Sequence, residues 1–328
     1  MKKSVYLLFV FVLTTANGFS ETVDEYLSIA EEYYNENKFE EVRAVLEEAR
    51  GLYPDHALLN LVSGNIYYRL GNIPLALEYI SRAIELDASL VNAYSLRFTI
   101  FFKALHAYDK ALENINMAIQ LDAENYALYV NRGRLFWQAF ANSVLAVDDY
   151  NRAIEIISSQ YILKEKESFD FEFNNYEYVL SLILKERGIV YFEVGNHEYA
   201  LGDLNEAVNL NGENTEILNH RGIILFGLGR HDEAFEDFNT AIRLDSNDFY
   251  GYDNRGVANL NLGRLHEALA DFTTAITIDP NVKKIYQFRS VTYLLLAEQA
   301  DSPTQAAYYL DCARIDEAAA NRLDGQSQ

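Results

Sequence analysis

The sequence predicts an all-α protein built from about eight stacked helical hairpins. An alanine recurs at nearly constant spacing, a second alanine stands seven residues before most of these, and a small residue stands nineteen or twenty residues before most of them. The chain also has only 4 prolines in 328 residues, which favours long helices joined by compact turns.

The recurring alanine closes each repeat, and its successive gaps are 34, 35, 35, 54, 34, 34 and 38 residues. The small residues let the two helices of a hairpin approach closely, while larger residues at helical spacing fill the core. A single hairpin cannot bury its apolar faces alone, so stability comes from contacts between neighbours. The closing alanines are Ala49, Ala83, Ala118, Ala153, Ala207, Ala241, Ala275 and Ala313.

Glycines mark the expected hairpin turns. Gly71, Gly195, Gly229 and Gly263 stand where one helix must end and the chain reverse, a place that favours positive φ. The third and fourth repeats each carry one extra residue, and Phe98 replaces the small residue in the third. We expect Phe98 to push its hairpin apart.

The pattern resembles the tetratricopeptide repeat, and nearly all of residues 21–319 show it. The resemblance implies a right-handed superhelical solenoid, used across the family mainly to bind peptides and proteins. It is clearest between Asp253 and Pro280, at six positions: Gly256, Gly263, Ala268, Phe272, Ala275 and Pro280.

Residues 1–20 have the order of a secretory signal peptide. Lys2 and Lys3 precede an apolar run from Val5 to Val12, and small residues follow. The run is shorter than the roughly 20 residues that a membrane span needs. Because the lone cysteine is Cys312, neither lipidation near the cleavage region nor an internal disulfide is expected. We therefore expect a periplasmic or secreted protein without a membrane span.

The gap of 54 places an insertion at about residues 158–177, between the fourth and fifth hairpins. Aromatic and acidic residues alternate there from Phe169 to Phe173, which predicts a short extended piece. It could dock a partner, assist self-association, fold into the groove, or pack as a loop on the solenoid. Residues 320–328 are expected to form a polar C-terminal tail.

The formal net charge is −22. Such a charge repels phosphate backbones and anionic lipid surfaces, so nucleic acid and membrane surfaces are poor candidate partners, and we expect no nucleic-acid partner. Basic or apolar partners fit better.

Arginine and aspartate recur together at two fixed repeat positions, which predicts ion pairs that link helices. Arg97 with Asn114 is a partial exception. We interpret the pairs as structural, because catalytic groups are not copied from repeat to repeat. They are Arg132 with Asp149, Arg187 with Asp203, Arg221 with Asp237, and Arg255 with Asp271.

An aromatic residue stands four residues after the small-residue position in six repeats. In tetratricopeptide repeats this position faces the concave groove, where flat rings favour ligand binding. The alternative is packing against a neighbouring helix. The six predicted groove residues are Tyr34, Tyr68, Phe102, Trp137, Phe192 and Phe226.

Four basic residues are expected beside this aromatic stripe: Arg69, Lys103, Arg134 and Lys185. A cationic track of this kind could hold a carboxylate or an acidic segment. The plainer interpretation is scattered solvated charges, with Glu216 and Asp253 among them.

No pattern of catalytic residues is present. The six histidines are dispersed, and the sequence contains no HExxH, no paired cysteines, no phosphate loop and no GxSxG. We expect neither an enzyme nor a bound metal or cofactor.

The leading hypothesis is therefore an exported adaptor or scaffold that holds a peptide segment of another envelope protein in its concave groove. The alternative is a carrier of a small molecule or lipid, acting as an accessory to a transporter. A second copy of the chain is a further candidate partner.

Overall fold

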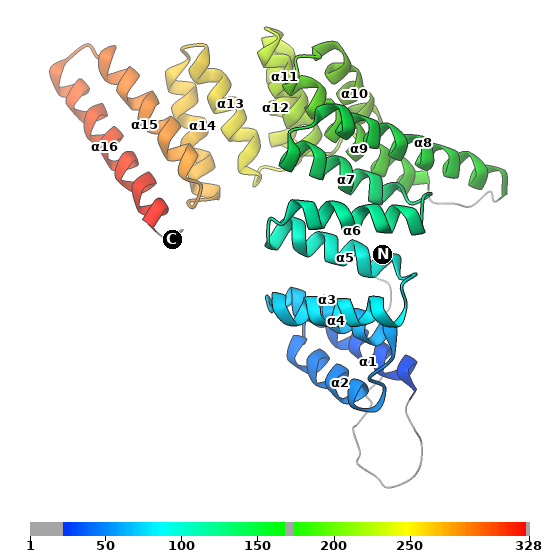
Figure 1. Ribbon diagram of the computed structural model, residues 1–328. Helices are drawn as coiled ribbons and strands as arrows, with labels where there is room; N and C mark the ends of the chain where they lie inside the picture. Colours follow the sequence, from blue (N-terminus) through cyan, green and yellow to red (C-terminus); the bar gives the residue numbers. More distant parts are fainter. Residues whose placement is uncertain (1–21, 168–172, 326–328) are drawn as a thin grey trace. The chain divides into compact units, whose positions relative to one another are not determined.

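The computed structural model describes residues 22–167 and 173–325, which form 16 α-helices and one short π-helical segment. The predicted all-α solenoid of about eight helical hairpins is confirmed. The chain divides into two compact units, residues 1–142 and 143–328 (Figure 1). The predicted signal peptide lies outside the described residues.

The first unit contains three complete hairpins and one further helix, each helix packing on the next. We call the odd-numbered helices A helices and the even-numbered ones B helices. The elements are α1 (Val23–Asn35), α2 (Phe39–Leu52), α3 (Ala57–Arg69), α4 (Ile73–Leu86), α5 (Val91–Thr99), the π-helical η1 (Ile100–Ala104), α6 (Tyr108–Leu121) and α7 (Tyr126–Phe140).

The second unit begins with a long B helix and continues with four hairpins. Its elements are α8 (Ser143–Glu167), α9 (Phe173–Glu193), α10 (His197–Leu210), α11 (Thr215–Gly227), α12 (His231–Leu244), α13 (Phe249–Asn261), α14 (Leu265–Ile278), α15 (Lys283–Glu298) and α16 (Pro303–Gly325).

Small residues allow the helices of a hairpin to approach closely. A Cβ added at Gly222 of α11 would lie 2.5 Å from the Phe238 ring of α12, and one added at Gly64 of α3 would lie 2.6 Å from Ile80 of α4. Phe238 and Ile80 are buried. In these hairpins the core therefore depends on a large side chain of helix B filling the space above a glycine of helix A.

The four predicted turn glycines all have positive φ, between 72° and 83°. In three other turns the positive φ falls on Asn37, His106 and Ala141. The chain reversal is therefore the same where glycine is missing, at a cost in strain for the residue that replaces it.

Phe98 does not prevent its hairpin from forming. Its ring is buried and stacks on that of Phe102 with the centroids 5.6 Å apart. The chain directly after it forms the π-helical turn η1, which accommodates the extra residue of the third repeat. Helices α5 and α6 still pack against each other.

The insertion lengthens two helices rather than forming a loop where it is described. Residues 158–167 continue α8, and residues 173–177 begin α9. The rings of Tyr161 and Tyr176 stack with centroids 4.1 Å apart, which joins the two extensions. Most of the alternating segment from Phe169 lies outside the described residues, so the predicted extended piece stays a prediction.

The polar tail predicted from residue 320 begins inside a helix. Helix α16 continues to Gly325, and Ala320 is buried. Alanine, arginine and leucine in this stretch are good helix formers, which explains the continuation.

Candidate functional site

The six predicted aromatic residues lie near the ends of A helices, and all six are half-buried. Four belong to the first unit and two to the second. They are Tyr34 in α1, Tyr68 in α3, Phe102 in η1, Trp137 in α7, Phe192 in α9 and Phe226 in α11.

Most of these rings pack on the first residue of the following B helix. Tyr34 meets Phe39 with the ring centroids 5.7 Å apart, and Phe226 meets His231 at 4.7 Å. The other two contacts are Phe102 with Tyr108 at 6.1 Å and Phe192 with His197 at 5.3 Å. These rings therefore pack across the hairpin turn, which is the alternative that the sequence analysis left open, and their role in binding a ligand stays a prediction.

In the first unit the structure brings two predicted residues together. The Arg69 guanidinium lies over the Tyr34 ring, 4.8 Å from its centroid. Tyr34 in turn lines a mostly apolar cavity of about 310 Å³ between α1 and α3. The cavity is lined by Leu27, Ala30, Glu31, Tyr34, Val42, Leu58, Val62, Asn65 and Ile66.

This cavity has the composition of a small binding pocket. Apolar side chains form its wall, while Glu31 and Asn65 supply the polar groups. Leu58 on the wall is 47% exposed, so the cavity is open to solvent on that side. The cavity can therefore accept an apolar side chain from solvent.

The other predicted cations do not share one environment. Lys103 is exposed and Arg134 is half-buried. Lys185 belongs to the second unit, is buried, and its ammonium lies 2.6 Å from a Glu216 oxygen. Because Glu216 neutralises it, Lys185 does not offer a free cation. A role for Arg69, Lys103 and Arg134 in binding an anion stays a prediction.

The second unit contains two buried polar side chains that the sequence interpretation missed. Asn219 is 5% exposed, and Asp253, expected to be solvated, is 7% exposed. Neither polar atom of the Asn219 amide has a hydrogen-bond partner among the described residues. The Oδ1 of Asp253 has none there either. Burial raises the pKa of Asp253, and Lys284 opposes this only partly. Their shared repeat position with Lys185 was the signal available in the sequence.

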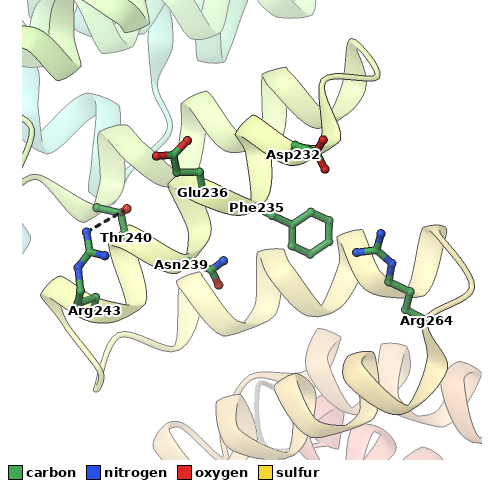
Figure 2. Close-up of a pocket in the computed structure, with 7 residues that line it drawn as sticks. All are labelled: Asp232, Phe235, Glu236, Asn239, Thr240, Arg243 and Arg264. Atoms are coloured by element: carbon green, nitrogen blue, oxygen red, sulfur yellow. Dashed lines mark hydrogen bonds between the residues drawn. The ribbon is translucent and has the colours of Figure 1, made fainter.

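A second, more polar cavity lies along one face of α12 and contains no predicted residue (Figure 2). Its volume is about 490 Å³, and it is lined by Asp232, Phe235, Glu236, Asn239, Thr240, Arg243 and Arg264. The Arg264 guanidinium lies 5.2 Å from the Phe235 ring centroid. A further cavity of about 420 Å³ shares these two residues and reaches the Arg255–Asp271 pair. Both acidic and basic side chains line the cavity along α12, so its charge favours no single class of ligand.

Three predicted arginine pairs lie inside the second unit, and all three are confirmed. Arg221 donates from Nε and Nη2 to both oxygens of Asp237 at 2.8 and 2.6 Å, and Arg187 and Arg255 bind Asp203 and Asp271 similarly. In the first unit Arg97 donates to Asn114, as expected.

A fourth pair, between Arg289 and Asp316, was missed because the last hairpin is longer. Each of the four pairs joins the two helices of one hairpin. Their repetition from hairpin to hairpin indicates a structural role.

Across the described residues no group of three His, Cys, Asp or Glu side chains could hold a metal ion. In the same part of the chain, no helix has both the length and the apolar character to cross a membrane.

Two stretches match family models described as tetratricopeptide repeat, residues 27–90 in the first unit and residues 213–278 in the second. Both units of the chain therefore contain tetratricopeptide repeats. Neither matching model indicates a catalytic family. No curated protein matches the sequence of the chain.

Solved structures share its fold. A tetratricopeptide repeat protein from Parabacteroides merdae is 18% identical with a TM-score of 0.62, and the match covers 82% of this chain and 98% of that one. Pseudomonas aeruginosa pilF is 14% identical with a TM-score of 0.54, covering 72% and 97%. A chain of the APC/C hetero-tetramer Cut9–Hcn1 is 17% identical with a TM-score of 0.54, covering 83% and 56%. At these identities the likeness concerns the fold alone.

Proposed function

We propose that this tetratricopeptide repeat protein is an exported adaptor that binds a peptide segment of a partner protein on the exposed faces of its A helices. Tetratricopeptide repeats mediate protein–protein binding, which sets the class of function. The observation that carries the proposal is the apolar cavity between α1 and α3, with Tyr34 on its wall and Arg69 stacked on that ring.

The cavity suits one bulky apolar side chain of an extended segment. Burying such a side chain contributes about 1.5–3 kcal/mol. Asn65 can bind the backbone of the segment, because its amide both donates and accepts hydrogen bonds. Glu31 on the lining favours a basic neighbour in the partner over an acidic one.

The size of the cavity also supports an alternative, a carrier of a small molecule or lipid. A volume of about 310 Å³ is at the lower end of ordinary ligand pockets, roughly 300–1,000 Å³. Mass spectrometry of the purified protein separates the two. A co-purifying metabolite or lipid supports the carrier, whereas a crosslinked protein supports the adaptor.

The test of the adaptor is affinity capture from native cell envelope with a matched pair of variants. Leu58→Glu places a charge on the cavity wall, and we expect the captured partner to be lost. Leu52→Glu, at a 61% exposed position of α2 outside the cavity, should capture as well as the parent protein. If Leu58→Glu captures the partner as well as Leu52→Glu does, the cavity is not the binding site.

Export is the second part of the proposal and is supported by the order of charged, apolar and small residues at positions 1–20. We expect the mature protein to begin near residue 21 and to fractionate with the periplasm or the medium. N-terminal sequencing of the native protein tests this. Retention of Lys2 and Lys3 in the mature chain would contradict it.

A further inference from the structure

Three buried polar residues occupy the same repeat position on neighbouring A helices. Lys185 in α9, Asn219 in α11 and Asp253 in α13 each stand three residues before the glycine that packs on helix B. They are 6%, 5% and 7% exposed. Helix α11 contacts both α9 and α13, so the three positions form a row within the second unit.

Only the first member of this row has a partner that satisfies it. The Lys185 ammonium pairs with Glu216 of the next A helix at 2.6 Å. Both polar atoms of the Asn219 amide and the Oδ1 of Asp253 meet no hydrogen-bond partner among the described residues. Unpaired buried polar groups destabilise a fold, so their presence requires a compensating role.

Among the described residues, no cation forms an ion pair with Asp253. Lys284 of α15 acts on its charge, but the Lys284 ammonium lies over the Phe288 ring, 5.0 Å from the centroid, and forms no ion pair with Asp253. Burial raises the pKa of the Asp253 carboxyl. An approaching cation would therefore gain a carboxylate partner that no described residue already occupies.

We propose that Asn219 and Asp253 form a polar subsite for the basic side chain and adjoining backbone of an extended peptide. Asp253 binds the ammonium or guanidinium group. Asn219 donates to a peptide carbonyl and accepts from a peptide N–H, which explains why both of its polar atoms are left unpaired. The choice of a peptide as the ligand rests on the proposed function. The subsite adds that this peptide carries a basic side chain.

Two further facts support a cationic ligand. The chain has a formal charge of −22, which raises the local concentration of cations and steers them to the surface. The same repeat position in α15 holds Gln287, which is exposed. Among the four described residues at this position from α9 to α15, Asn219 and Asp253 are therefore the ones that are buried with unpaired polar atoms. Entry of the ligand requires a change of side-chain rotamer, which is common on binding.

The experiment compares the full-length protein with Asp253→Asn and Asn219→Leu, using the peptide Ac-Ala-Ala-Lys-Ala-Ala-amide and its norleucine counterpart. Asn219→Leu removes an unpaired polar group, and Asp253→Asn removes the negative charge of a buried carboxylate. We expect each variant, without peptide, to melt about 2 °C or more above the parent. Each should bind the lysine peptide at least tenfold more weakly, on the order of one lost charged contact. Gln287→Leu is the matched control and should change neither quantity.

The parent should prefer the lysine peptide to the norleucine peptide. Equal binding of the two peptides, or unchanged melting temperature and affinity in Asp253→Asn, would overturn the subsite. n-Butylamine, which carries the ammonium group but no amide, separates peptide from free cation, because binding as tight as the pentapeptide would overturn the role of Asn219.

The outcome is independent of the envelope capture. If Leu58→Glu loses the captured partner while Asp253→Asn behaves like the parent, only the subsite fails. If the lysine peptide binds as described while nothing is captured from the envelope, the adaptor function fails and the subsite stands.

Discussion

The two units solve the same packing problem with different chemistry. In the second unit an arginine of each A helix from α9 to α15 binds an aspartate of its own hairpin through two nitrogens. Its remaining nitrogen donates to the preceding B helix, as Arg221 does to Asn205 and Arg255 to Asn239. Each arginine therefore joins two hairpins.

We call this series of arginine–aspartate pairs the ladder. The first unit lacks it at its start. Ser63 and Tyr79 stand at the positions that hold arginine and aspartate elsewhere. Tyr79 instead stacks on Tyr67 with centroids 5.4 Å apart, and the Arg50 guanidinium of the preceding B helix lies 3.9 Å from the Tyr79 centroid. A cation still links successive hairpins, but through an aromatic face.

The difference shows which features the repeat requires. Both units keep a glycine of helix A against a large side chain of helix B, as in Gly64 with Ile80 and Gly222 with Phe238. The polar link between hairpins varies. Close helix approach is therefore the fixed requirement, and the linking interaction can be exchanged.

The largest expected effect comes from breaking the ladder. Asp237→Ala leaves the half-buried Arg221 guanidinium without its carboxylate and should lower the free energy of unfolding by about 3–5 kcal/mol. Because repeats are stabilised by their neighbours, hydrogen exchange should accelerate first in α11 and α12. Urea unfolding and exchange by mass spectrometry measure the two effects.

The matched control is an exposed pair. Arg82 and Asp55 also form an ion pair in the first unit, with side chains 45% and 73% exposed, and Arg82→Ala should leave the free energy of unfolding almost unchanged because solvent screens the pair. If Asp237→Ala costs no more than Arg82→Ala, the ladder does not hold the second unit together.

A smaller loss is expected from the aromatic link. Tyr79→Ala removes the ring stack and the contact with Arg50, and should lower the free energy of unfolding by about 2 kcal/mol. Tyr79→Phe keeps the ring and should unfold like the parent. A large loss in Tyr79→Phe would show that the hydroxyl, not the ring, forms the link.

Most of the fold was predictable because it follows from the spacing of the repeated residues in the sequence. The small residues and turn glycines follow from helix geometry alone, and the pairs 16 residues apart are readable once the repeat is aligned. Arg289 with Asp316, 27 residues apart, escaped because a longer hairpin shifts the offset. The helical continuation of the insertion also escaped, because alternation over a few residues does not settle periodicity.

The candidate site was less predictable. Position in the repeat predicted Tyr34 and Arg69 on one surface, and the structure brings them into contact, but it did not predict that Lys185 is buried against Glu216 or that Asp253 is covered. Burial at these positions depends on how neighbouring A helices approach one another. A charge pattern along one helix does not contain that information.

The smallest effect is a gain at a turn. Ala141 has φ of 49°, where the second unit has glycine in the turns at Gly195, Gly229 and Gly263. Ala141→Gly should raise the free energy of unfolding by about 0.5–1 kcal/mol, because it relieves left-handed strain. Ala44→Gly, at an exposed position inside α2, should instead lower it by about 1 kcal/mol. The same sign in both variants would contradict the strain at Ala141.

The most direct test of the account is hydrogen exchange of the protein with and without its captured partner segment. Binding on the A helices predicts slowed exchange in α1 and α3, around the cavity that Tyr34 lines. Protection confined to α12 and α14, around the polar cavity of Figure 2, with α1 and α3 unchanged, would contradict it.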